Sequence, residues 1–163
     1  MAGKKGGKTG RKGRQDERRL EESVRAAIAR DPGMRGYEIG VKARGGEIVL
    51  TGVVDVLAEK ERLREIAAAV PGVERVEADL TVSTDGAITE RGVEMEAAEE
   101  LAARPGLDPA EVGVKVEGGV AHLVGRVDGP EEERAARAAV AKARGVTEVQ
   151  SHLKRGRKGN DPD

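Results

Sequence analysis

The sequence of 163 residues contains no cysteine, phenylalanine or tryptophan, and Tyr37 is its only tyrosine. The lack of cysteine excludes disulfides, thiolate nucleophiles and Cys-based zinc or iron–sulfur sites. The lack of Phe and Trp means that any core is built from Val, Leu, Ile and Ala, and that single-stranded nucleic acid would find no platform for base stacking. We therefore expect no metal and no cofactor.

Long apolar runs are missing as well. No stretch approaches the roughly 18 apolar residues that are needed to cross a bilayer. The basic start of the chain continues through glycines into the charged segment 15–22, so it lacks the apolar core of a secretory signal. We therefore expect a cytoplasmic protein that reaches a membrane only peripherally, at the inner face.

Charge is distributed unevenly along the chain, although the formal net charge is only −1. Ten cations near the two ends are the candidates for binding anionic phospholipid or another polyanion: Lys4, Lys5, Lys8, Arg11, Lys12, Arg14, Lys154, Arg155, Arg157 and Lys158. Outside these ten cations and the last two acids, 19 basic side chains stand against 28 acidic ones. The body is therefore acidic, and only the tails are suited to a polyanion.

A repeat organises the rest of the chain. Residues 38–55 read EIGVKARGGEIVLTGVVD, and residues 111–128 read EVGVKVEGGVAHLVGRVD. The two stretches align without insertion, and their glycines, their central leucine and their final aspartate coincide. The chain is therefore two copies of one unit of about 65 residues, close to the lower size at which a domain folds alone.

Each copy predicts the same series of elements. In the first copy, Leu20, Val24 and Ile28 mark the buried stripe of a helix that should begin at Asp16. Alternating stretches on both sides of a Gly-Gly pair predict a β-hairpin. A second helix and a last alternating strand follow, and this strand should run parallel to the second one. The predicted fold is α+β, with two tandem αββαβ units, each a small three-stranded mixed sheet packed against two helices.

Two further expectations concern the end of each hairpin. Gly52 and Gly125 interrupt the second strand, where the lack of a side chain would allow a helix to come close to the sheet. Asp55 and Asp128 follow the hairpins and are candidates to cap the next helices. Pro130 suits the first turn of such a helix.

The joint spacing of these features resembles the BON domain, a module named for bacterial osmotic-stress and nodulation proteins. The matching features in the first copy are the hairpin with its Gly-Gly turn, the helix 59–70, the Gly72-Val73 pair and Val76, and the second copy repeats them up to Val149. The resulting organisation is a disordered basic tail (1–15), BON unit one (16–82), a linker (83–87), BON unit two (88–153) and a disordered tail (154–163).

The resemblance implies a non-enzymatic binding module that associates with phospholipid, a membrane surface or a stress-response partner under osmotic stress. Tandem relatives of this kind are exported, whereas this sequence shows no export signal. The residues agree with the lack of catalysis, because no set of nucleophile, base and orienting group can be assembled from them. The alternatives are a nucleic-acid-associated stress protein that uses the same tails and a self-associating structural protein.

The sheets should each leave one face uncovered. Val49, Thr51 and Val53 are expected to form a small apolar patch on this face, with Val124 on the matching face of the second unit. We expect such faces to pack together, within the chain or as a homo-oligomer, rather than to hold a ligand. His122 and His152 should point to the same open face from neighbouring strands. Two imidazoles without a third ligand favour ordinary exposed histidines over a metal site.

Overall fold

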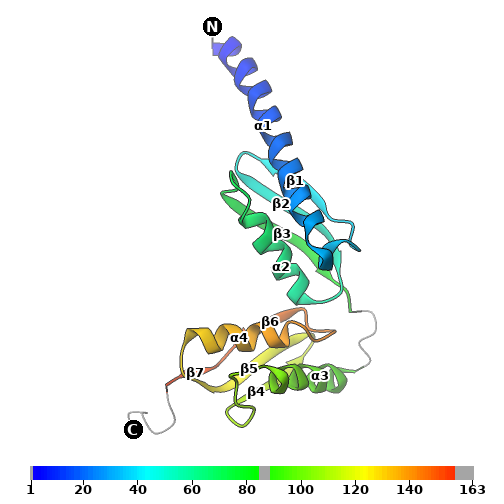
Figure 1. Cartoon of the computed structure of the whole chain (residues 1–163), viewed down its shortest axis with the longest axis vertical. Coiled ribbons are helices and arrows are strands. Elements are labelled where there is room, and N and C mark those ends of the chain that lie inside the picture. Colours follow the sequence, from blue (N-terminus) through cyan, green and yellow to red (C-terminus); the bar gives the residue numbers. More distant parts are fainter. Residues whose placement is uncertain (1, 85–88, 157–163) are drawn as a thin grey trace. The chain divides into compact units, whose positions relative to one another are not determined.

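The structure of the chain is a computed structural model that describes residues 2–84 and 89–156, with side chains from residue 13 on. It contains two compact units that follow the sequence repeat (Figure 1). Unit 1 runs from α1 to β3, and unit 2 runs from α3 to β7. Each unit combines helices with its own sheet, so the predicted α+β class and the tandem arrangement are confirmed.

Unit 1 has β2 at the centre of a three-stranded sheet of order β1-β2-β3. Its elements are α1 (Ala2–Arg30), the 3₁₀ turn η1 (Pro32–Met34), β1 (Gly40–Arg44), β2 (Glu47–Val54), α2 (Leu57–Ala68) and β3 (Arg75–Val82). Strands β1 and β2 form the predicted antiparallel hairpin, in which Val41 lies opposite Leu50 and Lys42 lies opposite Val49. The turn uses Gly45 at a φ of 60°, a conformation that favours glycine.

Unit 2 repeats this order. Its elements are α3 (Glu90–Ala103), β4 (Val112–Glu117), β5 (Val120–Val127), α4 (Pro130–Val140), β6 (Glu148–Ser151) and β7 (Lys154–Arg155). Strand β5 is central: β4 pairs with it antiparallel, and both β6 and β7 pair with it parallel. The predicted parallel course of the last strand is therefore confirmed in this unit.

The core of each unit is aliphatic, as the composition requires. Val24 of α1, Leu50 of β2 and Leu63 of α2 are fully buried in unit 1, and Leu123 of β5 and Val140 of α4 are fully buried in unit 2. Each such side chain contributes about 1.5–3 kcal/mol by leaving water. Since the buried side chains of β1 and β2 alternate with exposed or half-buried ones, only one face of the sheet is used for the core.

The glycines at the ends of the hairpins have a different role from the predicted one. Gly52 and Gly125 have φ values of 143° and 113°, and a Cβ on them would lie 2.8 Å from the carbonyl oxygen of Glu38 and 1.9 Å from that of Glu111. The close neighbour is thus the backbone just before the first strand of each hairpin. The expected approach of a helix is wrong, because the chain entering the sheet occupies this space.

The expected cap of α4 is also wrong. The N-cap position is taken by Gly129, which has no side chain to offer, and Pro130 occupies the first turn as predicted. The helix starts at Pro130, one residue later than expected, so Asp128 lies just before the N-cap residue. Its backbone N–H instead donates to the carboxylate of Glu132 at 2.9 Å, so the acid of the first turn reaches back to the chain.

Both ends of the folded part differ from the predicted boundaries. Helix α1 begins at Ala2, whereas the sequence predicts its start at Asp16. At the other end, β7 lies where a tail was predicted from Lys154 on. Strand β7 pairs with the end of β5 that extends past β6, so the backbone groups of β5 there also form hydrogen bonds. The Gly156 N–H, for example, donates to the Val127 carbonyl at 2.9 Å. Residues 85–88 and 157–163, which include most of the predicted linker and the end of the tail, lie outside the described residues.

Candidate binding surfaces

The uncovered face of the unit 1 sheet carries three rows of side chains, one on each strand. We name it open face 1 and define it by Lys42 and Arg44 on β1, Val49, Thr51 and Val53 on β2, and Glu77 and Asp79 on β3. A shallow hollow of about 580 Å³ is lined in part by Lys42, Val49, Thr51 and Glu77, so side chains from the three strands share one surface.

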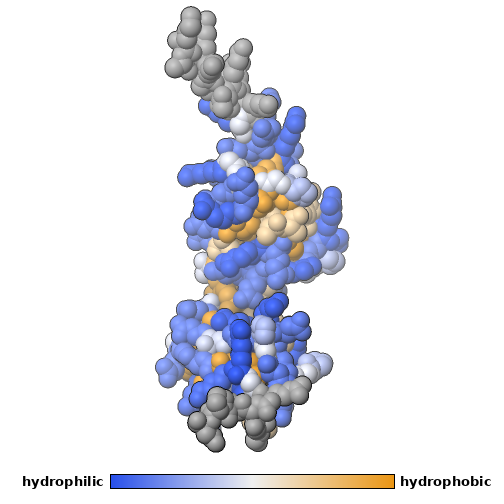
Figure 2. Space-filling view, turned by 90° about the vertical axis from the view of Figure 1, so that its left-hand side faces the viewer, coloured by the Kyte–Doolittle hydropathy of each residue, from blue (hydrophilic) through white to orange (hydrophobic). Residues whose placement is uncertain are grey.

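The predicted patch lies on this face. Val49, Thr51 and Val53 lie at alternate positions along β2, and Val53 is 56% exposed. In Figure 2, hydrophobic residues reach the surface of unit 1 within a hydrophilic surround. Val124 is likewise exposed on β5 of unit 2. Whether these residues form an interface stays a prediction.

The corresponding face of unit 2 contains the two histidines of the chain. His122 on β5 and His152, just after β6, lie side by side as predicted, with Nδ1 and Nε2 3.1 Å apart and ring centroids 5.3 Å apart. One ring donates and the other accepts, according to the tautomer. No group of three or more His, Cys, Asp or Glu side chains suited to a metal occurs among the described residues. The pair is therefore a polar element of this face.

Helix α1 closes the β1 edge of the unit 1 sheet with side chains one turn apart. The carboxylate of Glu17 accepts from the Gly45 N–H at 3.2 Å, and the carboxylate of Glu21 accepts from the Ala43 N–H at 3.0 Å. One further turn along, the Arg25 guanidinium donates to the Val41 carbonyl at 3.2 Å. These contacts, named here the edge clamp, satisfy backbone groups that could otherwise pair with another strand.

Unit 2 repeats the carboxylate half of the edge clamp. Glu90 accepts from the Gly118 N–H at 2.6 Å, and Glu94 accepts from the Val116 N–H at 3.5 Å. This role of the acids was not predicted from the sequence. A signal was present, because Glu17 and Glu21 fall on Glu90 and Glu94 when the two copies are aligned. Both units thus close the outer edge of the first hairpin strand in the same way.

The edge clamp should contribute measurably to stability. We expect Glu21→Ala to lower the free energy of unfolding by about 1–2 kcal/mol, because it leaves the half-buried Ala43 N–H without an acceptor. Glu22→Ala is the matched control, since Glu22 is the exposed neighbour on the same helix. Urea unfolding followed by circular dichroism measures both. An equal loss in the two variants would contradict the clamp.

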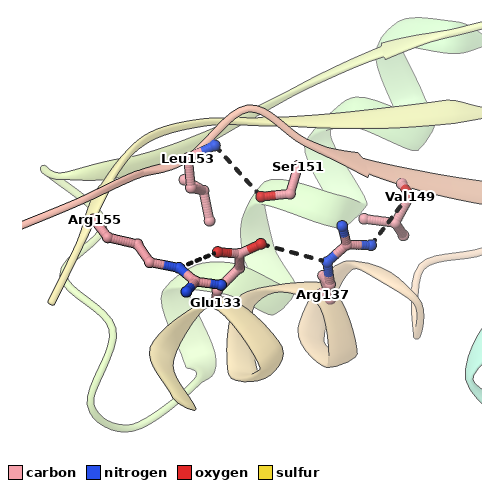
Figure 3. Close-up of polar contacts among 6 residues, drawn as sticks. All are labelled: Glu133, Arg137, Val149, Ser151, Leu153 and Arg155. Atoms are coloured by element: carbon pink, nitrogen blue, oxygen red, sulfur yellow. Dashed lines mark hydrogen bonds and ion pairs between the residues drawn. The ribbon is translucent and has the colours of Figure 1, made fainter. Parts of the chain in front are cut away.

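A second polar cluster holds the last strands of unit 2 against α4 (Figure 3). Glu133 on α4 pairs with Arg155 of β7 at 3.1 Å and with Arg137 of its own helix at 3.9 Å. Arg137 also donates to the Val149 carbonyl of β6 at 3.4 Å. The hydrogen bond from Arg155 is the main cause that lowers the pKa of Glu133; partial burial acts in the opposite direction, and Ser151 and Arg137 lower it further.

This lowered pKa predicts a pH dependence. A carboxyl whose pKa is lower in the folded state stabilises the fold above its unfolded pKa of about 4.3, and that stability is lost as the pH falls through the folded value. Between about pH 5 and pH 3, the unfolding free energy of the wild type should therefore decrease more steeply than that of Glu133→Gln. Glu131→Gln, on the exposed first turn of α4, is the control and should keep the wild-type slope. Equal slopes for Glu133→Gln and the wild type would refute the assignment.

Another hollow of unit 1 lies between α1 and α2. It has a volume of about 1020 Å³ and is lined by Ala and other small or aliphatic side chains together with Arg19, Glu22, Arg30, Arg62 and Glu65. Arg62 is already paired with Asp31 at 3.0 Å. The lining charges are of both signs, and Ser23 adds a hydroxyl group.

A comparison with protein families accounts for this architecture. The family model of the BON domain matches residues 16–84 and again residues 89–157. The chain belongs to the BON domain family. BON domains are generally non-catalytic and are associated with membranes or stress, which agrees with the two open-faced units. The resemblance inferred from the repeated hairpin is thus confirmed.

Other comparisons find more distant similarity to this BON protein. Two solved structures of CdsD, a structural protein of the type III secretion system of Chlamydia trachomatis, are similar to it. One is a C-terminal domain with 16% identity and a TM-score of 0.35, and the other has 14% identity and a TM-score of 0.34. They align with 84% and 83% of this chain, which spans 65% and 61% of their own lengths. A search of curated proteins found no match.

The predicted polyanion-binding cations of the BON protein have different environments. Arg14 on α1 and Lys154 on β7 are exposed, whereas the Arg155 guanidinium is engaged by Glu133. The other seven predicted cations lie outside the described side chains: Lys4, Lys5, Lys8, Arg11, Lys12, Arg157 and Lys158. In the described part of the chain, no helix has the length and apolar character of a membrane span.

Proposed function

We propose that this tandem BON protein is a non-catalytic binding module that attaches to anionic phospholipid at the cytoplasmic face of a membrane. The observation that carries the proposal is the charge of residues 1–15, which hold six cations and no acid next to an acidic body. Each cation near an anionic surface contributes about 1 kcal/mol, and the contribution decreases with salt. Six together suffice for reversible attachment.

The position of the basic segment supports this assignment. Residues 2–15 form the N-terminal part of α1, and the first fully buried side chain described in that helix is Val24. The helix extends past the sheet of unit 1 at this end (Figure 1). The basic segment can therefore meet a surface without disturbing the core. The edge clamp begins at Glu17 and is separate from it.

Nucleic acid is the competing polyanion. The same cations would neutralise phosphates, but the acidic body repels a long duplex, and the chain has no Phe or Trp for base stacking. Its single tyrosine, Tyr37, hydrogen-bonds Glu59 within unit 1. These features favour a membrane surface over nucleic acid, because only the basic tail then needs to lie near the anionic headgroups.

Flotation tests the proposal. The full chain should float with vesicles that contain phosphatidylserine at low salt and should remain at the bottom with pure phosphatidylcholine. A chain that lacks residues 1–15 should not float with either. The proposal fails if the full chain ignores anionic vesicles, or if the truncated chain still binds them. Preferential retention by duplex DNA in a competition with the vesicles would favour the nucleic-acid alternative instead.

A further inference from the structure

Open face 1 has a charge pattern that follows the order of its strands. The β1 row is cationic, with Lys42 and Arg44. The β3 row carries Glu77 and Asp79, together with Arg75, whose charge is neutralised by Glu47 of β2. Because β2 lies between β1 and β3, its largely aliphatic row separates the two charged rows. With neighbouring strands about 4.8 Å apart, the rows lie about 10 Å from each other.

The four charged side chains are not neutralised within the described part of the chain. None of them forms an ion pair there. By contrast, Arg75 and Glu47, at the hairpin end of the same sheet, are paired at 2.6 Å and cancel each other. Open face 1 thus presents unpaired positive charge on one side, unpaired negative charge on the other and exposed Val53 between them.

We propose that open face 1 is a self-complementary surface on which a second copy of this chain docks, sheet against sheet. A two-fold axis that runs along β2, between two stacked sheets, places the β1 row of each copy over the β3 row of the other. Cations then face anions on both sides, and the Val49 to Val53 rows pack on each other at the usual sheet spacing of about 10 Å.

The charges also select between the ways of stacking two such faces. A two-fold axis across the strands would place Lys42 and Arg44 over the same residues of the partner, and likewise Glu77 and Asp79. Like charges opposite each other would oppose this packing. Only the axis along the strands satisfies both charged rows, and it makes the two β2 strands run in the same direction.

Other occupants fit this face less well. Its two cations and two anions give no net charge for a nucleic acid or a lipid surface to recognise. The matching face of unit 2 does not complement it either, because its outer strands each carry mixed side chains: Lys115 and Glu117 on β4, with Glu148 and Gln150 on β6. A second copy of open face 1 is the partner with the required segregation of charge.

The proposed dimer is independent of the proposed attachment to phospholipid. A single three-stranded face is a small interface, so dissociation constants on the order of 10–100 μM are expected. Sedimentation velocity of the full chain over a concentration series that brackets this range measures the equilibrium. The dimer should weaken as salt is raised, because two rows of exposed charge pairs contribute to it.

Charge reversal tests directly the proposed orientation of the two stacked sheets. Lys42→Glu with Arg44→Glu makes all four of these unpaired charges negative, and Glu77→Lys with Asp79→Lys makes all four positive. Each variant alone should dimerise at least about tenfold more weakly than the wild type, since like charges now face each other. An equimolar mixture of the two should recover dimers, and so should one chain that carries all four reversals.

The control is Lys115→Glu, the equivalent of Lys42 on unit 2, which should dimerise like the wild type. Circular dichroism confirms that each variant is folded. The proposal is overturned if the wild type stays monomeric throughout the series, which is also the result expected if another part of the same chain covered the face. Dimers that survive either double reversal, or a mixture that fails to recover them, would also overturn it.

Discussion

Gly125→Ala should be the most damaging single methyl that can be added to unit 2, lowering its free energy of unfolding by about 3–5 kcal/mol. Gly125 has a φ of 113°, a region that L side chains rarely adopt, and a Cβ would lie 1.9 Å from the Glu111 carbonyl oxygen. The same oxygen accepts from the Arg126 N–H at 2.9 Å. It cannot move away without breaking that hydrogen bond, so strain and a lost backbone contact add together.

Two other glycines provide the scale for this prediction. A Cβ on Gly113 would meet Val124 Cγ2 at 3.6 Å, an ordinary contact, so Gly113→Ala should change stability by less than about 0.5 kcal/mol. Gly52→Ala should lie between the two, because its nearest atom, the Glu38 oxygen, is 2.8 Å away and its φ is 143°. Urea unfolding ranks the three variants. A Gly125→Ala protein as stable as Gly113→Ala would disprove the backbone contact.

The element order could be predicted because burial leaves a local trace in the sequence. Val24 and Ile28 recur at the period of a helix, and Ile48 and Leu50 recur at the period of a strand, whatever the rest of the chain does. The second copy shows the same two periods at the aligned positions, which supports the same assignment. The parallel course of the last strand followed from the handedness of such crossovers, which holds in nearly all proteins.

Contacts between elements leave no such trace, and here prediction failed or was silent. Glu17 and Glu21 are unremarkable as surface acids, and only the position of α1 beside β1 makes them acceptors for the strand edge. The role of Gly125 depends on where Glu111 enters the sheet. Strand β7 exists because β5 extends beyond β6, a length difference that no local pattern encodes.

The candidate surface was predicted only in part for the same reason. Val49, Thr51 and Val53 could be placed on one face because they alternate with buried residues along a single strand. The charge pattern of open face 1 needs the strand order as well. Lys42 and Glu77 are 35 positions apart in the sequence, and only a central β2 places them on opposite sides of the aliphatic row.

Neutralising the basic segment should have the largest effect on binding. At about 1 kcal/mol per cation near an anionic surface, each Lys or Arg replaced by Gln should weaken vesicle binding about fivefold at low salt. Replacing two, four and then all six of Lys4, Lys5, Lys8, Arg11, Lys12 and Arg14 should give a graded loss that reaches about 10⁴-fold. Titration with phosphatidylserine vesicles measures the series, and the dependence on salt should become shallower at each step.

The matched control keeps the charge and changes the side chain. Replacing Lys4, Lys5, Lys8 and Lys12 by Arg should leave vesicle binding within about threefold of the wild type, because attraction to a diffuse anionic surface depends on charge rather than on the shape of the cation. A large loss in the Arg series would mean that a specific headgroup pocket reads the lysines. An unchanged affinity in the Gln series would show that binding, if present, resides in the folded units.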